Sequence, residues 1–266
     1  MILMENESCF GVLGNQAAPY ETALASEYAV ARVYAVSHPS LPNYLALVGG
    51  NTFGITTDCN PDECSLTNTS IADLLQSHGL SWKEYAESMP TNCSQSDSPD
   101  GLYSPKHNPF VYFTSVSGNA GSGPTSQYCD SHVVPFTQFS NDLGRDQLPS
   151  YSFITPNLCD DAHSCPLSTA DSWLSKVISG VMNSSSYSSS AVFIVYDEGE
   201  GSTPGTPSLV TCILVSPFAK HGFLSHAYYT HYSILATVEW MLGLGNLGRN
   251  DTTSGVMSDM FSVNVS

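Results

Sequence analysis

Basic residues are scarce in this chain of 266 residues, which has seven lysines and arginines against 24 aspartates and glutamates. The resulting formal charge of −17 argues against nucleic acid and an anionic membrane as main partners, because both would be repelled. Charged residues of either sign make up only 12% of the sequence, about half the usual share. Such an acidic chain fits acidic surroundings, where protonated carboxylates relieve the self-repulsion.

Long apolar runs, internal repeats and linker-like breaks are also missing from the sequence. No stretch is long and apolar enough to predict a membrane span. A chain of this length can bury one substantial core. We therefore expect residues 1–266 to form a single domain.

The eight cysteines lack the Cys-x-x-Cys spacing of zinc sites, which favours disulfides over a metal cluster. Three pairs stand out, although the sequence leaves their connectivity open: Cys59 with Cys64, Cys93 with Cys129, and Cys159 with Cys165. Cys9 and Cys212 have more apolar neighbours, and we expect them to be buried thiols. Disulfides indicate an oxidising compartment, so the protein is expected to be secreted or extracytoplasmic.

Strand-like and helix-like segments alternate along the chain. We expect strands over residues 2–4, 29–36, 80–85, 150–155, 191–196 and 209–216, and helices over residues 69–79, 136–146, 170–182 and 229–242. The apolar run 191–196 is typical of a strand buried on both faces. This alternation predicts a three-layer α/β/α sandwich around a mostly parallel sheet. Residues 91–126 are expected to form a long functional loop, because they combine Ser, Pro and Gly with aromatic residues.

The segment Ser37-His38-Pro39-Ser40-Leu41-Pro42-Asn43-Tyr44 predicts a tight turn that leads into a buried helix. Pro42 suits the first turn of a helix, which places Ser40 just ahead of it. There the hydroxyl would face free N–H groups and the positive end of the helix dipole, a position that favours an alkoxide or a bound phosphate. Ser40 could instead be an ordinary N-cap.

Acidic and amide side chains follow two of the expected strands. Glu5-Asn6 comes directly after the first, and Asp197-Glu198 after the strand 191–196. Ligands of parallel sheets bind at the carboxyl ends of strands. With Ser40, these residues offer five oxygen donors, which suit Mg²⁺, Ca²⁺ or Mn²⁺ better than Zn²⁺. The alternative for the acidic pair is an exposed turn.

Two histidines, His107 and His163, lie in polar segments that are expected to be loops. At neutral or mildly acidic pH an imidazole can donate to a phosphate oxygen or protonate a leaving group. For any single histidine, a position on the surface without a function is the default expectation.

Taken together, several segments resemble the acid phosphatase and phospholipase C phosphoesterases of the alkaline-phosphatase superfamily. They are Glu5-Asn6, residues 37–44, Lys106-His107-Asn108-Pro109-Phe110, residues 152–163, Tyr196-Asp197-Glu198-Gly199 and Val215-Ser216-Pro217. The resemblance extends over nearly the whole chain. The family's Glu-Asn is commonly followed by His or Arg and then Ser, whereas this chain has Glu7-Ser8.

The resemblance implies a role for each matching residue. Ser40 would be the nucleophile and a metal ligand. Glu5, Asn6, Asp197 and Glu198 would hold one divalent metal ion, and Asn43, His107 and His163 would contact the phosphoryl group. We further assign His163 as the acid that protonates the leaving group.

These residues predict a secreted, metal-dependent acid phosphatase that hydrolyses small phosphomonoesters through a phosphoserine intermediate. One alternative is phosphodiester cleavage of the phospholipase C type. Another is a non-catalytic secreted protein that binds metal or phosphate, although binding alone would not need a nucleophile. An α/β serine hydrolase is disfavoured, because no Gly-x-Ser-x-Gly motif surrounds Ser40.

Overall fold

A computed structural model describes residues 1–119, 123–200 and 208–262. Its strands form one eight-stranded sheet in the order β4-β3-β5-β1-β6-β7-β2-β8. Strand β7 runs antiparallel to both of its neighbours, β6 and β2, and the other pairs are parallel. The strands are β1 Ile2–Met4, β2 Ala29–Tyr34, β3 Trp82–Ala86, β4 Val133–Pro135, β5 Tyr151–Thr155, β6 Val192–Tyr196, β7 Leu209–Val215 and β8 Phe223–Thr230.

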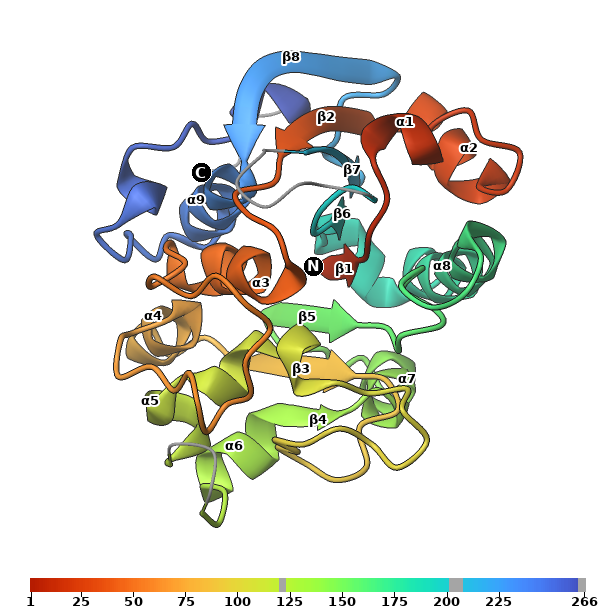
Figure 1. Ribbon diagram of the computed structural model, residues 1–266. Coiled ribbons are helices and arrows are strands. Elements are labelled where there is room, and N and C mark those ends of the chain that lie inside the picture. Colours follow the sequence, from red (N-terminus) through yellow and green to blue (C-terminus); the bar gives the residue numbers. More distant parts are fainter. Residues whose placement is uncertain (120–122, 201–207, 263–266) are drawn as a thin grey trace.

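Helices cover both faces of this sheet. Figure 1 shows α3, α4 and α9 on one side and α2, α7 and α8 on the other. The helices are α1 Cys9–Val12, α2 Pro19–Glu27, α3 Ser40–Gly49, α4 Ile71–Ser77, α5 Thr114–Ser117, α6 Gln127–His132, α7 Thr137–Gly144, α8 Leu167–Met182 and α9 His231–Leu242. Short 3₁₀ turns occupy Pro105–His107, Pro109–Tyr112, Ser185–Ser189, Asn250–Thr252 and Ser258–Met260. The described part of the chain contains no helix with the length and apolar character needed to cross a bilayer.

The predicted α/β/α sandwich with a mostly parallel sheet is confirmed. Each predicted strand and helix has a counterpart in the structure, with ends that differ by a few residues. Ser40 is the first residue of α3, with Pro39 as its N-cap, so the prediction that it precedes the helix was wrong by one position. The start predicted for the last helix was also early, because Tyr229 and Thr230 end strand β8 and α9 begins at His231.

Other elements were not predicted, among them α1, α2, α6, β4 and most of β8. Strand β4 has only three residues and α1 only four, so neither is long enough to show a period in the sequence. In β8, a run of exposed residues hides the alternation that marks a strand. The described part of the expected 91–126 loop contains two 3₁₀ turns and α5.

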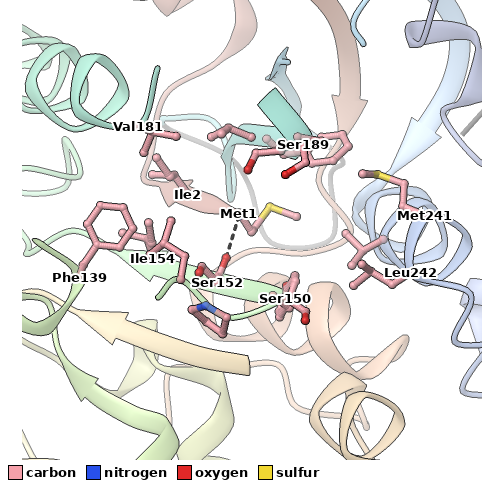
Figure 2. A pocket seen from close by; sticks show the side chains of 18 residues that line it. Met1, Ile2, Phe139, Ser150, Ser152, Ile154, Val181, Ser189, Met241 and Leu242 are labelled. Atoms are coloured by element: carbon pink, nitrogen blue, oxygen red, sulfur yellow. Dashed lines mark hydrogen bonds between the residues drawn. The ribbon is translucent and has the colours of Figure 1, made fainter. Parts of the chain in front are cut away.

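The two ends of the parallel strands differ in chemistry. At the amino ends of β1, β5 and β6 lies a mainly apolar cavity of about 190 Å³, whose lining includes Ile2, Ile154 and Phe193 (Figure 2). At the opposite ends, β1 and β6 lead into Glu5 and Asp197, which are completely buried. The polar cluster therefore lies where ligands of such sheets bind.

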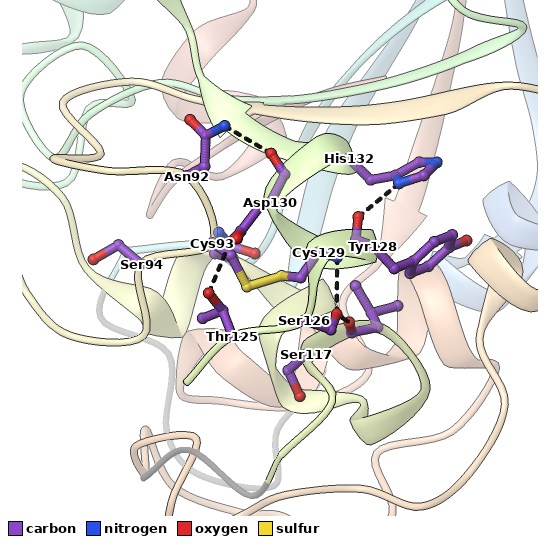
Figure 3. Close-up of a disulfide and its surroundings, with 12 residues drawn as sticks. Asn92, Cys93, Ser94, Ser117, Thr125, Ser126, Tyr128, Cys129, Asp130 and His132 are labelled. Carbon is purple, nitrogen blue, oxygen red and sulfur yellow. Dashed lines mark hydrogen bonds between the residues drawn. A yellow bond between two sulfur atoms is a disulfide. The ribbon is translucent and has the colours of Figure 1, made fainter. Parts of the chain in front are cut away.

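Three disulfides join the pairs singled out in the sequence: Cys59–Cys64, Cys93–Cys129 and Cys159–Cys165. Cys9 and Cys212 are buried thiols, as predicted. Figure 3 shows the Cys93–Cys129 bridge, which ties the start of the long loop to α6. Beside it, the Asn92 side chain donates to the Asp130 carbonyl at 2.7 Å. This bridge anchors the segment that carries Lys106 and His107.

The bridges differ in the length of chain that they close, and this difference makes a prediction about stability. Replacing Cys93 and Cys129 with serine should lower the free energy of unfolding by about 4 kcal/mol. The bridge joins residues 36 positions apart and so restricts a long loop of the unfolded chain. The matched pair Cys59 and Cys64, separated by 5 residues, should cost only about 2 kcal/mol. Urea unfolding of both double variants measures the difference. Equal losses would contradict the chain-entropy argument.

Candidate active site

The register of the sheet brings Glu5 and Asp197 side by side. Strands β1 and β6 are parallel and pair Met4 with Tyr196, so the next residue of each strand emerges at the same edge. The hydrogen bonding between the two strands extends one residue further, because the Asp197 N–H donates to the Met4 carbonyl at 2.9 Å. The Asp197 carboxylate accepts the N–H groups of Asn6 at 3.1 Å and Glu198 at 2.6 Å.

Ser40 reaches this cluster from the start of α3. Its hydroxyl donates to Glu5 Oε2 at 3.0 Å. Ser40 also acts on Asp197, whose pKa is raised by burial and lowered in part by Ser40. The Ser40 side chain is almost completely buried. The structure thus places Ser40 against Glu5, beside the Asp197 that follows the neighbouring strand.

Burial and mutual repulsion shape the acid–base state of the carboxylates. Burial, followed by the charges of Asp197 and Asp161, raises the pKa of Glu5 well above its usual value. Burial raises the pKa of Asp197 to about 7. Burial and then the neighbouring Asp197 raise the pKa of Glu198 to about 9. The carboxylates can all be ionised only if a cation compensates them.

The donor set fits a divalent cation. Asp197 Oδ2 is buried and has no hydrogen-bond partner in the described structure, which leaves an oxygen available for coordination. Glu5, Ser40, Asp197 and Glu198 supply the oxygens that hard cations prefer. A second grouping shares Glu5: one ligand atom each from Glu5, His107 and His163 lies within 4.8 Å of the others, and these nitrogens would suit zinc.

Asn6 and Asn43 surround this cluster. Asn6 adopts a φ of 60°, a left-handed conformation that asparagine tolerates. Asn43 Oδ1 accepts the N–H groups of Val36 and Ser37 at 3.0 Å each, and its Nδ2 lies 3.4 Å from Glu198 Oε2. The Asn43 amide therefore fixes the turn that precedes Ser40, and its contact with a phosphoryl group stays a prediction.

His107 is buried between two carboxylates. Its Nε2 lies 3.3 Å from Glu5 Oε1 and its Nδ1 lies 3.3 Å from Asp161 Oδ2. Burial, followed by the charge of Lys106, lowers the pKa of His107 to about 3, so the imidazole is neutral. His163 is partly exposed, and burial followed by Lys106 lowers its pKa as well. The two rings meet edge to face, with centroids 5.5 Å apart.

Sequence reasoning missed the roles of two neighbours of Ser40. The Tyr44 hydroxyl donates to Glu5 Oε1 at 2.6 Å, and its ring stacks on His107 with centroids 5.1 Å apart. Tyr44 lies four residues after Ser40, on the same helix face, and this spacing could have revealed it. His38 Nδ1 lies 2.7 Å from Glu198 Oε2, a contact that no sequence pattern indicates.

Two further charged residues border Ser40 and were assigned no role in the sequence. Asp58 Oδ1 accepts the N–H of Leu41 at 3.0 Å, and Asp58 Oδ2 lies 3.1 Å from Lys106 Nζ. The same Lys106 Nζ lies 3.3 Å from His163 Nε2. Asp58, which binds the N–H of the residue after Ser40, is therefore paired with a cation that also contacts His163.

The fold and this polar cluster define the class of the protein. Solved structures with a similar fold include a protein of the alkaline phosphatase superfamily from Vibrio parahaemolyticus, with a TM-score of 0.60 and 12% identity over 97% of this chain and 70% of that chain. The phosphonate monoester hydrolase of Agrobacterium radiobacter has a TM-score of 0.63 and 12% identity over 98% of this chain and 76% of its own. At such low identity the likeness shows the fold alone.

The chain belongs to the Phosphoesterase family, whose sequence profile matches residues 3–245. The predicted resemblance is thereby confirmed. The chain is 36% identical to the phosphate-repressible acid phosphatase of Penicillium chrysogenum, over 84% of this chain and 54% of that protein. It is 33% identical to the phosphatidylinositol-3-phosphatase of Mycobacterium tuberculosis, over 93% of this chain and 77% of that protein. The chain spans about half the length of the curated acid phosphatases it matches.

Proposed function

We propose that this chain is a metal-dependent acid phosphatase that hydrolyses phosphomonoesters, with Ser40 as the nucleophile. The observation that carries the proposal is the Ser40 hydroxyl, which donates to Glu5 Oε2 at 3.0 Å at the sheet edge where Glu5 and Asp197 emerge side by side. A serine needs a nearby base or cation to become an effective nucleophile. Membership of the Phosphoesterase family and the acid phosphatases among the relatives support the same activity.

Each residue has a defined task in the proposed reaction. The Ser40 hydroxyl gives its proton to Glu5, to which it donates at 3.0 Å, as its oxygen attacks phosphorus. The ester oxygen leaves with the bonding electrons and takes a proton from the imidazolium form of His163. Asn43 and His107 donate to the phosphoryl oxygens. Water then attacks the phosphoserine and gives a proton back to His163, phosphate leaves, and Ser40 takes its proton back from Glu5. His107 can donate although it is neutral, because a neutral imidazole keeps one N–H.

We assign Glu5, Asn6, Ser40, Asp197 and Glu198 as the ligands of one divalent metal ion. Bound there, the ion supplies Lewis-acid stabilisation of the charge on the serine and phosphoryl oxygens. The oxygen-rich set favours Mg²⁺, Ca²⁺ or Mn²⁺, whereas recruitment of His107 and His163 would favour Zn²⁺. The pKa of His107, lowered to about 3 by burial and then by the charge of Lys106, keeps this ring neutral, as metal ligation requires.

Secretion is part of the proposal, and the three disulfides support it, since such bonds persist in oxidising compartments. The proposed substrates are small phosphorylated molecules, because a net charge of −17 disfavours polyanionic partners. An acidic optimum fits the same charge, since protonated carboxylates repel a phosphate dianion less.

An assay of two substrates across pH tests the proposed function. The purified chain should hydrolyse p-nitrophenyl phosphate faster than bis(p-nitrophenyl) phosphate. A chelator should abolish the activity, and adding back one divalent metal at a time should restore it and identify the ion. Faster cleavage of the diester would favour the phospholipase C type of activity instead. Metal or phosphate binding without turnover of either substrate would indicate a non-catalytic protein.

A further inference from the structure

The carboxylate of Asp58 accepts hydrogen bonds from two donors near Ser40. Its Oδ1 accepts the N–H of Leu41 at 3.0 Å, and its Oδ2 accepts from Lys106 Nζ at 3.1 Å. Leu41 directly follows Ser40 at the start of α3. The anion thus lies across the amino end of the helix that carries the nucleophile candidate.

These donors are of the kind that a phosphoryl group requires. Amides at the start of a helix and a lysine ammonium both bind phosphate oxygens. Near Ser40 such amides are few, because Pro42 has no N–H. A separate feature also points to a ligand here: buried His107 Nε2 has no hydrogen-bond partner in the described structure. The His107 ring packs on His163, whose Nε2 lies 3.3 Å from Lys106 Nζ.

The Asp58 side chain can leave this position without unfolding its loop. The backbone next to it is fixed by the Cys59–Cys64 disulfide and by the buried Tyr112, whose hydroxyl donates to the Cys59 carbonyl at 2.7 Å. The side chain itself is 24% exposed and has solvent to turn into. A rotation of this one side chain would release both Leu41 N–H and Lys106.

We propose that Asp58 is a built-in competitor for the phosphoryl group, and that Lys106 is the substrate-binding cation for which they compete. The proposal rests on the proposed phosphatase function. Two anions repel each other across so short a distance, so a phosphate dianion must displace the Asp58 carboxylate to reach Lys106 and Leu41 N–H. Competition of this kind keeps the affinity for the product phosphate low and favours its release.

The test compares Asp58→Asn with Asp62→Asn, a control that removes the same charge from an exposed position of the same loop. Calorimetric titration of inorganic phosphate into the metal-loaded proteins should give a Kd roughly tenfold lower for Asp58→Asn. The Asp62→Asn protein should match the wild type. The KM for p-nitrophenyl phosphate should fall with the Kd. Asp58→Ala, which frees both donors completely, should bind phosphate at least as tightly as Asp58→Asn.

A higher Kd for phosphate in the Asp58 variants would overturn the proposal. If Asp58 instead served to hold Lys106 in place, both Asp58 variants would bind phosphate more weakly than the wild type. An unchanged Kd would overturn it as well. Lys106→Gln should weaken phosphate binding by roughly tenfold or more, and phosphate binding unaffected by this change would refute the assigned role of Lys106. Because the readout is phosphate binding, the result is separate from the turnover assay that tests the proposed function.

Discussion

Replacing Ser40 with alanine should reduce turnover of p-nitrophenyl phosphate by roughly 10⁴-fold or more, because the variant lacks the atom that attacks phosphorus. The loss corresponds to about 5 kcal/mol of transition-state stabilisation. The fold should survive, since the hydroxyl is small and its partner Glu5 keeps the hydrogen bond from Tyr44. Steady-state assays together with thermal unfolding separate loss of chemistry from loss of structure.

The control for this experiment is Ser115→Ala, which removes an exposed hydroxyl at a distant position in the sequence and should leave turnover unchanged. Acid quenching of the wild type during turnover, followed by mass analysis, should reveal a phosphate on the peptide that contains Ser40. Turnover by Ser40→Ala within tenfold of the wild type would disprove the nucleophile assignment.

The second large effect is expected for Glu5→Gln, because three side chains of the site contact the Glu5 carboxylate. Ser40 Oγ, Tyr44 OH and His107 Nε2 all lie within 3.3 Å of its carboxylate oxygens. Glutamine keeps the shape but removes the charge that holds a cation and orients the serine. We expect kcat/KM to fall roughly a thousandfold and metal affinity to fall at least roughly a hundredfold. Tyr44→Phe, which removes one donor to the same carboxylate, should lose only roughly tenfold.

A measurement of stability distinguishes a functional role of Glu5 from a merely structural one. The pKa of Glu5 in the folded chain is raised well above 4.5, so the metal-free wild type loses stability as the pH rises above that value. Metal-free Glu5→Gln escapes this loss and should be more stable at pH 7 by about 1 to 2 kcal/mol. The difference should vanish near pH 4 and widen toward pH 8. A variant that is both inactive and less stable across this range would contradict the prediction.

Local pattern was sufficient for much of the fold and for the central residues of the site. The apolar run before Asp197 predicted a buried strand and an acidic pair at its end, and both are observed. Pro42 and the apolar residues after it predicted helix α3 with Ser40 just ahead of it, one position from the observed start at Ser40. Such features depend on neighbours in the sequence, which act through backbone geometry and periodic burial.

Tertiary structure alone decided how these pieces meet. The parallel register of β1 and β6 makes Glu5 a neighbour of Asp197, although the two lie 192 positions apart in the chain. No sequence pattern predicts the contacts Asp58–Lys106 and His38–Glu198 either. Side-chain contacts between distant segments depend on strand order and loop path, which no local period encodes. The sequence by itself therefore determined which chemical groups the site contains, and the packing of the sheet and its loops determined which of them touch.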